Sequence, residues 1–216
     1  MITVARLSSE NARRTRDQLR SEIDTLHERR RFEAELDRAF DLHDREEDVL
    51  SIARAALERL DPERLIEIHL VDPAKPLLNL VTTTFSNVAR PEQTRTWSPW
   101  ESVAVRQGQS VIYDTTDRLD VCQHLQSRIT ETCSAVCIPL SVQGRMLGVL
   151  YALGPNHSAP PQKSIEILHH IASRTAIHVA LTRTLSKDGG TSIDHLTGLP
   201  DDEPGKPAST SCRNRA

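Results

Sequence analysis

The sequence predicts an α+β fold in which an antiparallel sheet is backed by helices, with long helices flanking it at the N- and C-terminal ends. Apolar residues recur at three- and four-residue steps through residues 8–60 and again through 165–185, which is the helical period. Between these stretches lie short apolar runs separated by Pro, Gly and Asp, which is typical of strands joined by turns.

The N-terminal stretch reads as an amphipathic helix, or as two helices with a break near residues 41–44. Leu19, Ile23 and Leu26 begin its apolar stripe, but arginines and glutamates fill the stripe as far as Leu36. A strong coiled coil is therefore not expected over this part. Pro62 ends the helical stretch, because proline lacks an amide donor and constrains the preceding residue.

The middle of the chain reads as alternating strands and short helices. Gly108 stops one short helix, since glycine is the usual residue just past a helix end. A polar loop that carries two tryptophans precedes that helix. The expected elements are strands at 65–71 and 78–84 joined by a turn at 72–76, a helix at 102–107, a strand at 110–114 and a helix at 120–130.

A hairpin and a long helix complete the predicted domain. Two apolar runs, 135–142 and 146–153, flank the glycine-bearing loop 143–145, which has hairpin length. Pro160 and Pro161 then open a helix that ends at the two glycines 189–190. The remainder is rich in Pro, Gly, Ser, Asp and Thr and is expected to be disordered.

Composition excludes several classes of function. The 216 residues carry a formal net charge of −3, which gives no general attraction to nucleic acid or to an anionic membrane. No apolar run approaches the ~18 residues of a membrane span, and the N-terminus lacks a signal-peptide core. A cytoplasmic protein is expected, whose four cysteines are free thiols rather than a disulfide scaffold.

Three stretches resemble the GAF family of sensory domains. Residues 104–114 resemble that family's segment of helix, glycine, strand and aspartate, and 135–140 resemble its strand ending in Pro-Leu. Residues 144–150 match its G-x-x-x-G-V-L hairpin return. The resemblance implies a small sheet with a pocket that binds a ligand of unknown identity, or a domain that serves for dimerisation.

A second resemblance lies near the end of the chain. Residues 194–200, Asp-His-Leu-Thr-Gly-Leu-Pro, resemble the D-x-L-T-G-L opening of the GGDEF family of diguanylate cyclases. The family's Asn-Arg pair is replaced by Asp201 and Asp202, and no G-G-D/E-E-F loop occurs in the chain. We therefore expect a signalling helix at 1–41, a GAF-like domain at 42–186 and a disordered tail at 187–216 with a remnant of the cyclase opening.

These resemblances imply a regulatory module without catalytic residues. The expected function is to bind a small molecule or partner, to form a homodimer through the flanking helices, and to pass the signal to a diguanylate cyclase domain that makes cyclic di-GMP. No nucleic-acid or membrane partner is expected. Motif positions suggest a ligand site formed by Trp97, Trp100, Tyr113, Asp114, Cys122 and His124.

Ligand classes can be weighed from the residues. The N-K-x-D/E signature of cyclic-nucleotide-binding relatives is absent. Bilin-binding relatives use an adjacent Cys-His pair, whereas here Gln123 separates Cys122 from His124 and aromatic residues make up only 3% of the chain. On an extended strand Cys133 and Cys137 lie ~13 Å apart at ~3.3 Å per residue. That separation is too great for one zinc ion with its ~2.3 Å bonds, so no metal site is expected.

Two alternatives to a sensor remain open. The free methionine sulfoxide reductases also resemble GAF domains and use cysteines near the pocket, one of which corresponds to Cys122. Their second cysteine, before the central strand, is missing here, where residues 103–107 contain none. The other alternative is a scaffold that only dimerises through its flanking helices and binds no ligand.

Overall fold

A computed structural model describes residues 2–84, 96–128 and 131–188. It divides the chain into two units, residues 1–182 and 183–216, and of the second it describes only the end of the last helix. Of the predicted disordered tail, 187–216, only residues 187 and 188 are described, and the cyclase-like segment 194–200 lies outside the described residues.

The elements, in chain order, are α1 (Ile2–Asp41), α2 (Glu46–Leu60), β1 (Leu65–Val71), β2 (Leu78–Thr83), the 3-10 helix η1 (Pro99–Glu101), α3 (Val103–Gln107), β3 (Val111–Tyr113), α4 (Gln123–Arg128), β4 (Cys133–Val142), β5 (Arg145–Pro155) and α5 (Gln162–Asp188).

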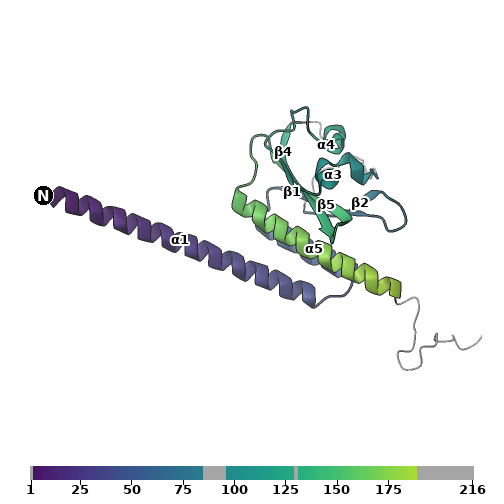
Figure 1. Ribbon diagram of the computed structural model, residues 1–216, viewed down its shortest axis with the longest axis horizontal. Coiled ribbons are helices and arrows are strands. Elements are labelled where there is room, and N and C mark those ends of the chain that lie inside the picture. Colours follow the sequence, from purple (N-terminus) through teal and green to yellow (C-terminus); the bar gives the residue numbers. More distant parts are fainter. Residues whose placement is uncertain (1, 85–95, 129–130, 189–216) are drawn as a thin grey trace, which may run out of the picture. The chain divides into compact units, whose positions relative to one another are not determined.

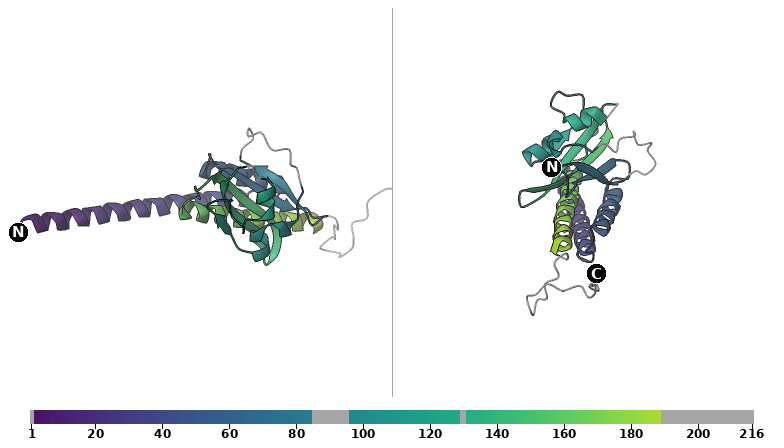
Figure 2. Two further views of the ribbon diagram at one scale, coloured as in Figure 1. Left: turned by 90° about the horizontal axis from the view of Figure 1, so that it is seen from above. Right: turned by 90° about the vertical axis from the view of Figure 1, so that its right-hand side faces the viewer.

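One five-stranded antiparallel sheet forms the centre of the first unit, in the order β2-β1-β5-β4-β3. The first two strands and the later hairpin meet through the β1–β5 pairing, in which Glu67 lies opposite Tyr151 and His69 opposite Val149. The C-terminal part of α1 lies with α2 and α5 on one face of the sheet, and α3 and α4 lie on the other (Figure 1; Figure 2, right). This arrangement confirms the predicted α+β fold with long flanking helices.

The hairpin between β4 and β5 is tighter than the sequence predicted. Val142 pairs with Arg145, so the loop contains only Gln143 and Gly144 rather than three residues. Both have positive φ, 50° and 78°, which is the type I′ geometry favoured in two-residue hairpins. Arg145, assigned to the loop from sequence, is therefore the first residue of β5, because the twist of the paired strands selects the shorter turn.

Period-two alternation along the strands creates two separate cores. In β1, Ile66, Ile68 and Leu70 face the long helices, whereas Glu67 and His69 lie on the opposite face. The first core, under the long helices, contains Leu36, Phe40, Val49, Ala53, Ala56, Leu57, Ile66, Ile68, Leu70, Val136, Ile138, Leu140, Leu147, Leu150, Ala152, Leu168, Ile171, Ala172, Ala176 and Val179. The second core, under α3 and α4, contains Leu78, Trp97, Ala104, Val105, Tyr113, Val121, Cys122, Leu125, Ala135, Cys137, Val149 and Tyr151.

The C-terminal part of α1 is attached to α5 by both apolar and charged contacts. Phe40, which is fully buried, stacks on the His178 ring at a centroid distance of 5.1 Å. Asp37 lies 2.8 Å from Arg174 Nε and 3.2 Å from His170 Nε2. These contacts hold the two flanking helices together on the first core. Among the described residues, none of the helices has the length and apolar character needed to cross a membrane.

Candidate ligand-binding site

Four rings from four parts of the chain meet in the second core. His69 comes from β1, Tyr151 from β5, His124 from α4, and Trp97 from the segment that bridges to Leu78 of β2. The Trp97 and His124 rings are stacked, with centroids 3.7 Å apart and planes 13° from parallel. His69 meets both Trp97 and Tyr151 edge-on, at 5.5 Å and 5.6 Å. We call His69, Trp97, His124 and Tyr151 the ring cluster.

A carboxylate lies beside the ring cluster. Glu67 Oε2 is 3.2 Å from His69 Nε2, and Trp97 Nε1 is 3.4 Å from His69 Nδ1. Because an indole N–H can only donate, His69 Nδ1 accepts, and the His69 ring therefore carries its proton on Nε2 and donates it to Glu67. Glu67, His69 and Trp97 are all less than 5% exposed. Burial of a polar group destabilises the fold unless the group is hydrogen-bonded, so these hydrogen bonds restrict the three side chains to one arrangement.

The second core also holds Tyr113, whose hydroxyl donates to the Asp120 carbonyl oxygen at 3.1 Å. Burial, with smaller contributions from Cys122, Cys137 and Asp120, raises the pKa of Tyr113 to about 12. The phenol therefore remains protonated throughout the physiological pH range and acts here as a hydrogen-bond donor.

This shift predicts a loss of stability at alkaline pH. A raised pKa in the folded state means that the stabilisation is complete below the unfolded value of about 10 and is lost as pH rises from there towards about 12. Tyr113→Phe, which cannot ionise, should lose less unfolding free energy than the wild type over that interval. Urea unfolding at a series of pH values measures this difference, and identical pH slopes for the two proteins would contradict the prediction.

The structure places the six residues predicted from sequence in two different environments. Trp97, Tyr113, Cys122 and His124 are all buried on the α3/α4 side of the sheet. Trp100, at 68% exposure on η1, and Asp114, which contacts the exposed His157 at 2.7 Å, lie on the surface. The assignment of these six residues to a ligand site stays a prediction.

Sequence reasoning missed Glu67, His69 and Tyr151. A signal for the first two was present, since Glu67 and His69 interrupt the run Leu-Ile-Glu-Ile-His-Leu-Val at alternate positions. Two polar residues on one face of an otherwise apolar strand indicate a polar cluster inside the domain rather than a solvent-facing edge. Tyr151 carried no comparable signal, because its neighbourhood depends on the β1–β5 register.

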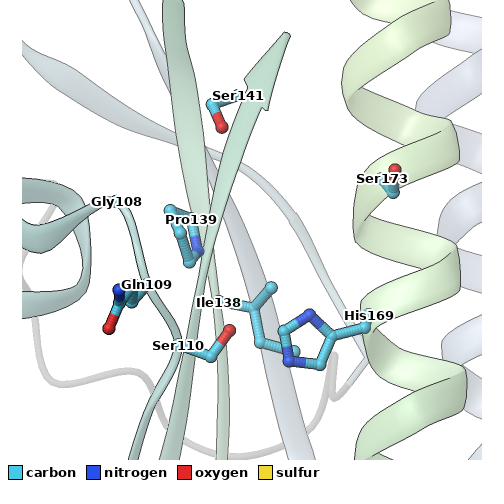
Figure 3. Close-up of a pocket in the computed structure, with 8 residues that line it drawn as sticks. All are labelled: Gly108, Gln109, Ser110, Ile138, Pro139, Ser141, His169 and Ser173. Carbon is cyan, nitrogen blue, oxygen red and sulfur yellow. The ribbon is translucent and has the colours of Figure 1, made fainter. Parts of the chain in front are cut away.

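A separate cavity of about 430 Å³ lies between β4 and α5, near the turn that precedes β3. Figure 3 shows the Ser110 hydroxyl and the His169 ring both directed towards Ile138. Ser110 Oγ is buried and has no hydrogen-bond partner among the described residues. Burial lowers the pKa of His169. The lining has no Asp, Glu, Lys or Arg and consists of Gly108, Gln109, Ser110, Ile138, Pro139, Ser141, His169 and Ser173.

The described residues contain no group of three or more His, Cys, Asp and Glu side chains arranged to hold a metal ion. The His69 and His124 rings meet edge-on with centroids 5.7 Å apart, and His124 stacks on Trp97. Their arrangement favours recognition by stacking and hydrogen bonding.

Comparison with protein families and solved structures places this fold among known domains. The family model described as GAF domain matches residues 43–180. Curated proteins give no match to the chain. The GAF domain of a phosphoenolpyruvate-protein phosphotransferase from Coxiella burnetii is 13% identical, with 74% of this chain and 96% of that chain covered and a TM-score of 0.60.

Two further solved structures illustrate the range of proteins that share the fold. A free methionine-R-sulfoxide reductase from Neisseria meningitidis, in complex with its substrate, is 18% identical, with 73% of this chain and 91% of that chain covered and a TM-score of 0.57. A domain of a putative two-component sensor histidine kinase from Sinorhizobium meliloti is 17% identical, with coverages of 66% and 96% and a TM-score of 0.53. At these identities the likeness concerns the fold alone.

Proposed function

The chain belongs to the GAF domain family, whose members are typically sensory modules of signalling proteins, and we propose that it senses a small molecule through the ring cluster and relays the signal through α1 and α5. The observation that carries this proposal is the alternation in β1. The Glu67 and His69 side chains lie on the ring-cluster side of β1, while Ile66 and Ile68, which alternate with them, pack in the first core with the long helices. A change in the ring cluster therefore acts on the strand that supports the helices.

The chemistry of the ring cluster suits a flat, polar small molecule. Trp97 and His124 offer stacking surfaces, and Glu67 with His69 offers a hydrogen-bond acceptor and donor. Because the rings are in contact with one another, a ligand enters by replacing ring–ring contacts with its own. Binding then favours the arrangement of strands and helices that accommodates it, with a coupling free energy typically of ~1–3 kcal/mol.

The two tryptophans allow a direct test. Trp100→Phe leaves Trp97 as the sole tryptophan, inside the ring cluster, and Trp97→Phe leaves Trp100, on the surface. Native mass spectrometry and an absorbance spectrum of the purified chain identify any co-purified ligand, and a metabolite library supplies candidates otherwise. A true ligand should change the emission of the Trp100→Phe protein and leave that of the Trp97→Phe protein unchanged. Equal responses in both variants would place binding elsewhere, and no response to any compound would favour the scaffold alternative.

The relay requires a homodimer, which we propose forms through the flanking helices. Leu19, Ile23 and Leu26 form an apolar stripe on α1 and are each about half exposed, at 53%, 49% and 46%. On α5, Ile177 and Leu181 are also exposed, at 41% and 52%. Exposed apolar stripes at helical spacing are typical of helix–helix interfaces, and a second copy supplies an identical stripe.

Ile23→Glu should convert the dimer to a monomer or weaken it by at least about tenfold, because it buries a carboxylate at the centre of the stripe. Ser21→Glu introduces the same side chain on the opposite side of α1 and should leave the dimer intact. Sedimentation equilibrium of both variants and the wild type measures the association. A monomeric wild type, or equal weakening by both variants, would argue against the helix interface.

We further propose that the output is cyclic di-GMP synthesis, on the strength of the D-x-L-T-G-L-like residues 194–200. The test is a fusion of this chain to the catalytic domain of a diguanylate cyclase. Insertion of two residues after Asp188 rotates the output by ~200°, whereas seven residues nearly preserve its phase, at ~3.6 residues per turn. Helical relay predicts that ligand control of synthesis is lost with two inserted residues and retained with seven. Control that survives both insertions equally would contradict it.

The redox alternative is tested by incubating the chain with free methionine sulfoxide and a dithiol reductant. A sensor leaves the sulfoxide unchanged. Turnover that disappears in Cys122→Ser would favour the reductase instead.

A further inference from the structure

The cavity between β4 and α5 lies where β4 extends beyond the end of β3. Val111, the first residue of β3, pairs with Cys137, whereas β4 continues as far as Val142. No described strand pairs with residues 138–142 on the side of β3. The turn 108–110 and helix α5 border the cavity there, as Figure 3 shows. Its volume of about 430 Å³ falls within the ~300–1,000 Å³ typical of small-molecule sites.

The turn that borders the cavity is fixed by the end of α3. Gly108 has a φ of 63°, the left-handed conformation that glycine readily adopts just past a helix. The backbone N–H groups of Gly108 and Gln109 donate to the carbonyl oxygens of Val105 and Ala104. Because α3 already accepts these two bonds, the turn offers a ligand its side chains rather than these amides.

The hydroxyl of Ser110 lacks a hydrogen-bond partner within the described part of the protein. Its oxygen is buried, and Figure 3 shows it directed towards Ile138 at the cavity. Ser134 of β4 provides a contrast, because its buried hydroxyl donates to the Ser158 carbonyl oxygen at 3.0 Å and accepts from Arg64 at 3.3 Å. A buried hydroxyl without a partner lowers the stability of the fold. A ligand that hydrogen-bonds to Ser110 removes this cost.

The other polar groups of the cavity are uncharged. Its lining contains no Asp, Glu, Lys or Arg. Burial lowers the pKa of His169, which favours the neutral imidazole with one donor and one acceptor nitrogen. Ser173 lies four residues after His169, on the same side of α5, and Ser141 lies on β4. The hydroxyls of Ser110, Ser141 and Ser173 can each donate and accept. This set favours an uncharged ligand whose own groups also do both.

We propose that this cavity is a second ligand site, which binds a neutral polyhydroxylated molecule such as a monosaccharide. Hydroxyl groups of the ligand pair with the serines and with His169, and its C–H groups pack on Ile138 and Pro139. Ile138 belongs to the first core, so this site lies on the opposite face of the sheet from the ring cluster. Neither site requires the other, and the failure of one proposal leaves the other standing.

Methyl NMR of the full chain tests binding at this cavity. The protein is labelled at its isoleucine methyl groups, and the Ile138 signal is assigned by its loss in Ile138→Val. D-glucose, D-galactose and D-mannose are added at millimolar concentration. We expect at least one of these sugars to shift the Ile138 signal in a saturable way. The 6-phosphate and the uronate of the sugar that binds should bind at least about tenfold more weakly, because the cavity offers no side chain to pair with their charge.

Three variants localise the binding and separate it from folding. Ser110→Ala removes a hydroxyl without a partner in the described protein, so it should weaken sugar binding at least about fivefold without lowering the urea unfolding midpoint. Ser134→Ala, the control, removes a hydroxyl that is bonded within the fold and should lower that midpoint but leave binding unchanged. Ser173→Phe fills the cavity from an exposed position on α5 and should abolish the sugar-induced shift of Ile138.

The absence of an Ile138 shift with all three sugars would overturn the proposal. So would equal affinity for the charged counterparts, or unchanged binding by Ser110→Ala. The emission of Trp97 in the Trp100→Phe protein should stay constant on addition of sugar, because the ring cluster lies on the other face of the sheet. A change in that emission without a shift of Ile138 would assign the sugar to the ring cluster and overturn the second site.

Discussion

Gly148→Ala should destabilise the protein by at least about 3 kcal/mol, because a side chain at this position collides with the backbone of the neighbouring strand. Gly148 lies on the central strand β5, opposite Leu70 of β1 and Leu140 of β4. An added Cβ would overlap the His69 carbonyl oxygen and lie 2.9 Å from Leu70 Cδ2. A carbonyl held in a sheet ladder cannot move aside as a flexible side chain does, so β1 must separate from β5.

The matched control for this change is Gly144→Ala in the hairpin turn. An added Cβ there meets no atom within 4 Å, so its cost comes only from the positive φ of 78° and should be about 1 kcal/mol. Urea unfolding of both variants gives the two free energies. Equal losses would show that glycine's backbone freedom, rather than the close approach of β1, determines the cost at residue 148.

The second large effect is expected for His69→Ala, which should cost about 3 kcal/mol. The change removes the hydrogen bonds of His69 to Glu67 and Trp97 and its ring contacts with Trp97, His124 and Tyr151. The Glu67 side chain, 4% exposed, then remains buried without its imidazole donor. Removal of one partner from a buried polar pair lowers the stability of the fold, because the remaining group stays out of contact with water and has lost its hydrogen bond to that partner.

His170→Ala is the control, since its contact with Asp37 is also 3.2 Å long but leaves the two side chains 27% and 39% exposed. Water replaces much of such an interaction, and the expected loss is below about 1 kcal/mol. Thermal and urea unfolding compare the two variants. Equal losses of unfolding free energy in His170→Ala and His69→Ala would contradict the view that burial strengthens the Glu67–His69 contact. The same pair of variants also serves the ligand experiment, because only His69→Ala should abolish the response of Trp97.

The positions of Trp100 and Asp114 show how short-range geometry limits a site prediction. Trp100 is three residues from Trp97, yet it lies in η1, where the Ser98 and Glu101 side chains form a capping box. That turn directs Trp100 into solvent while Trp97 enters the second core. Similarly, Asp114 follows Tyr113 at the end of β3, and successive residues of a strand point to opposite faces. Proximity in the sequence therefore did not bring Trp100 to the site of Trp97, or Asp114 to the site of Tyr113.

The helices and strands of this protein follow from local sequence patterns, because helical and strand periods, proline stops and glycine turns are properties of neighbouring residues. The sequence thus predicted the flanking helices, the strands and the α+β class, and its motifs predicted the GAF family. Which side chains contact one another depends instead on the three-dimensional packing of elements that are distant in the sequence. Glu67 and His69 reach Tyr151 and Trp97 through the β1–β5 register, and His124 reaches Trp97 through the packing of α4. Those contacts join distant residues, and a one-residue slip in that register would send the shifted strand's side chains to the other face of the sheet.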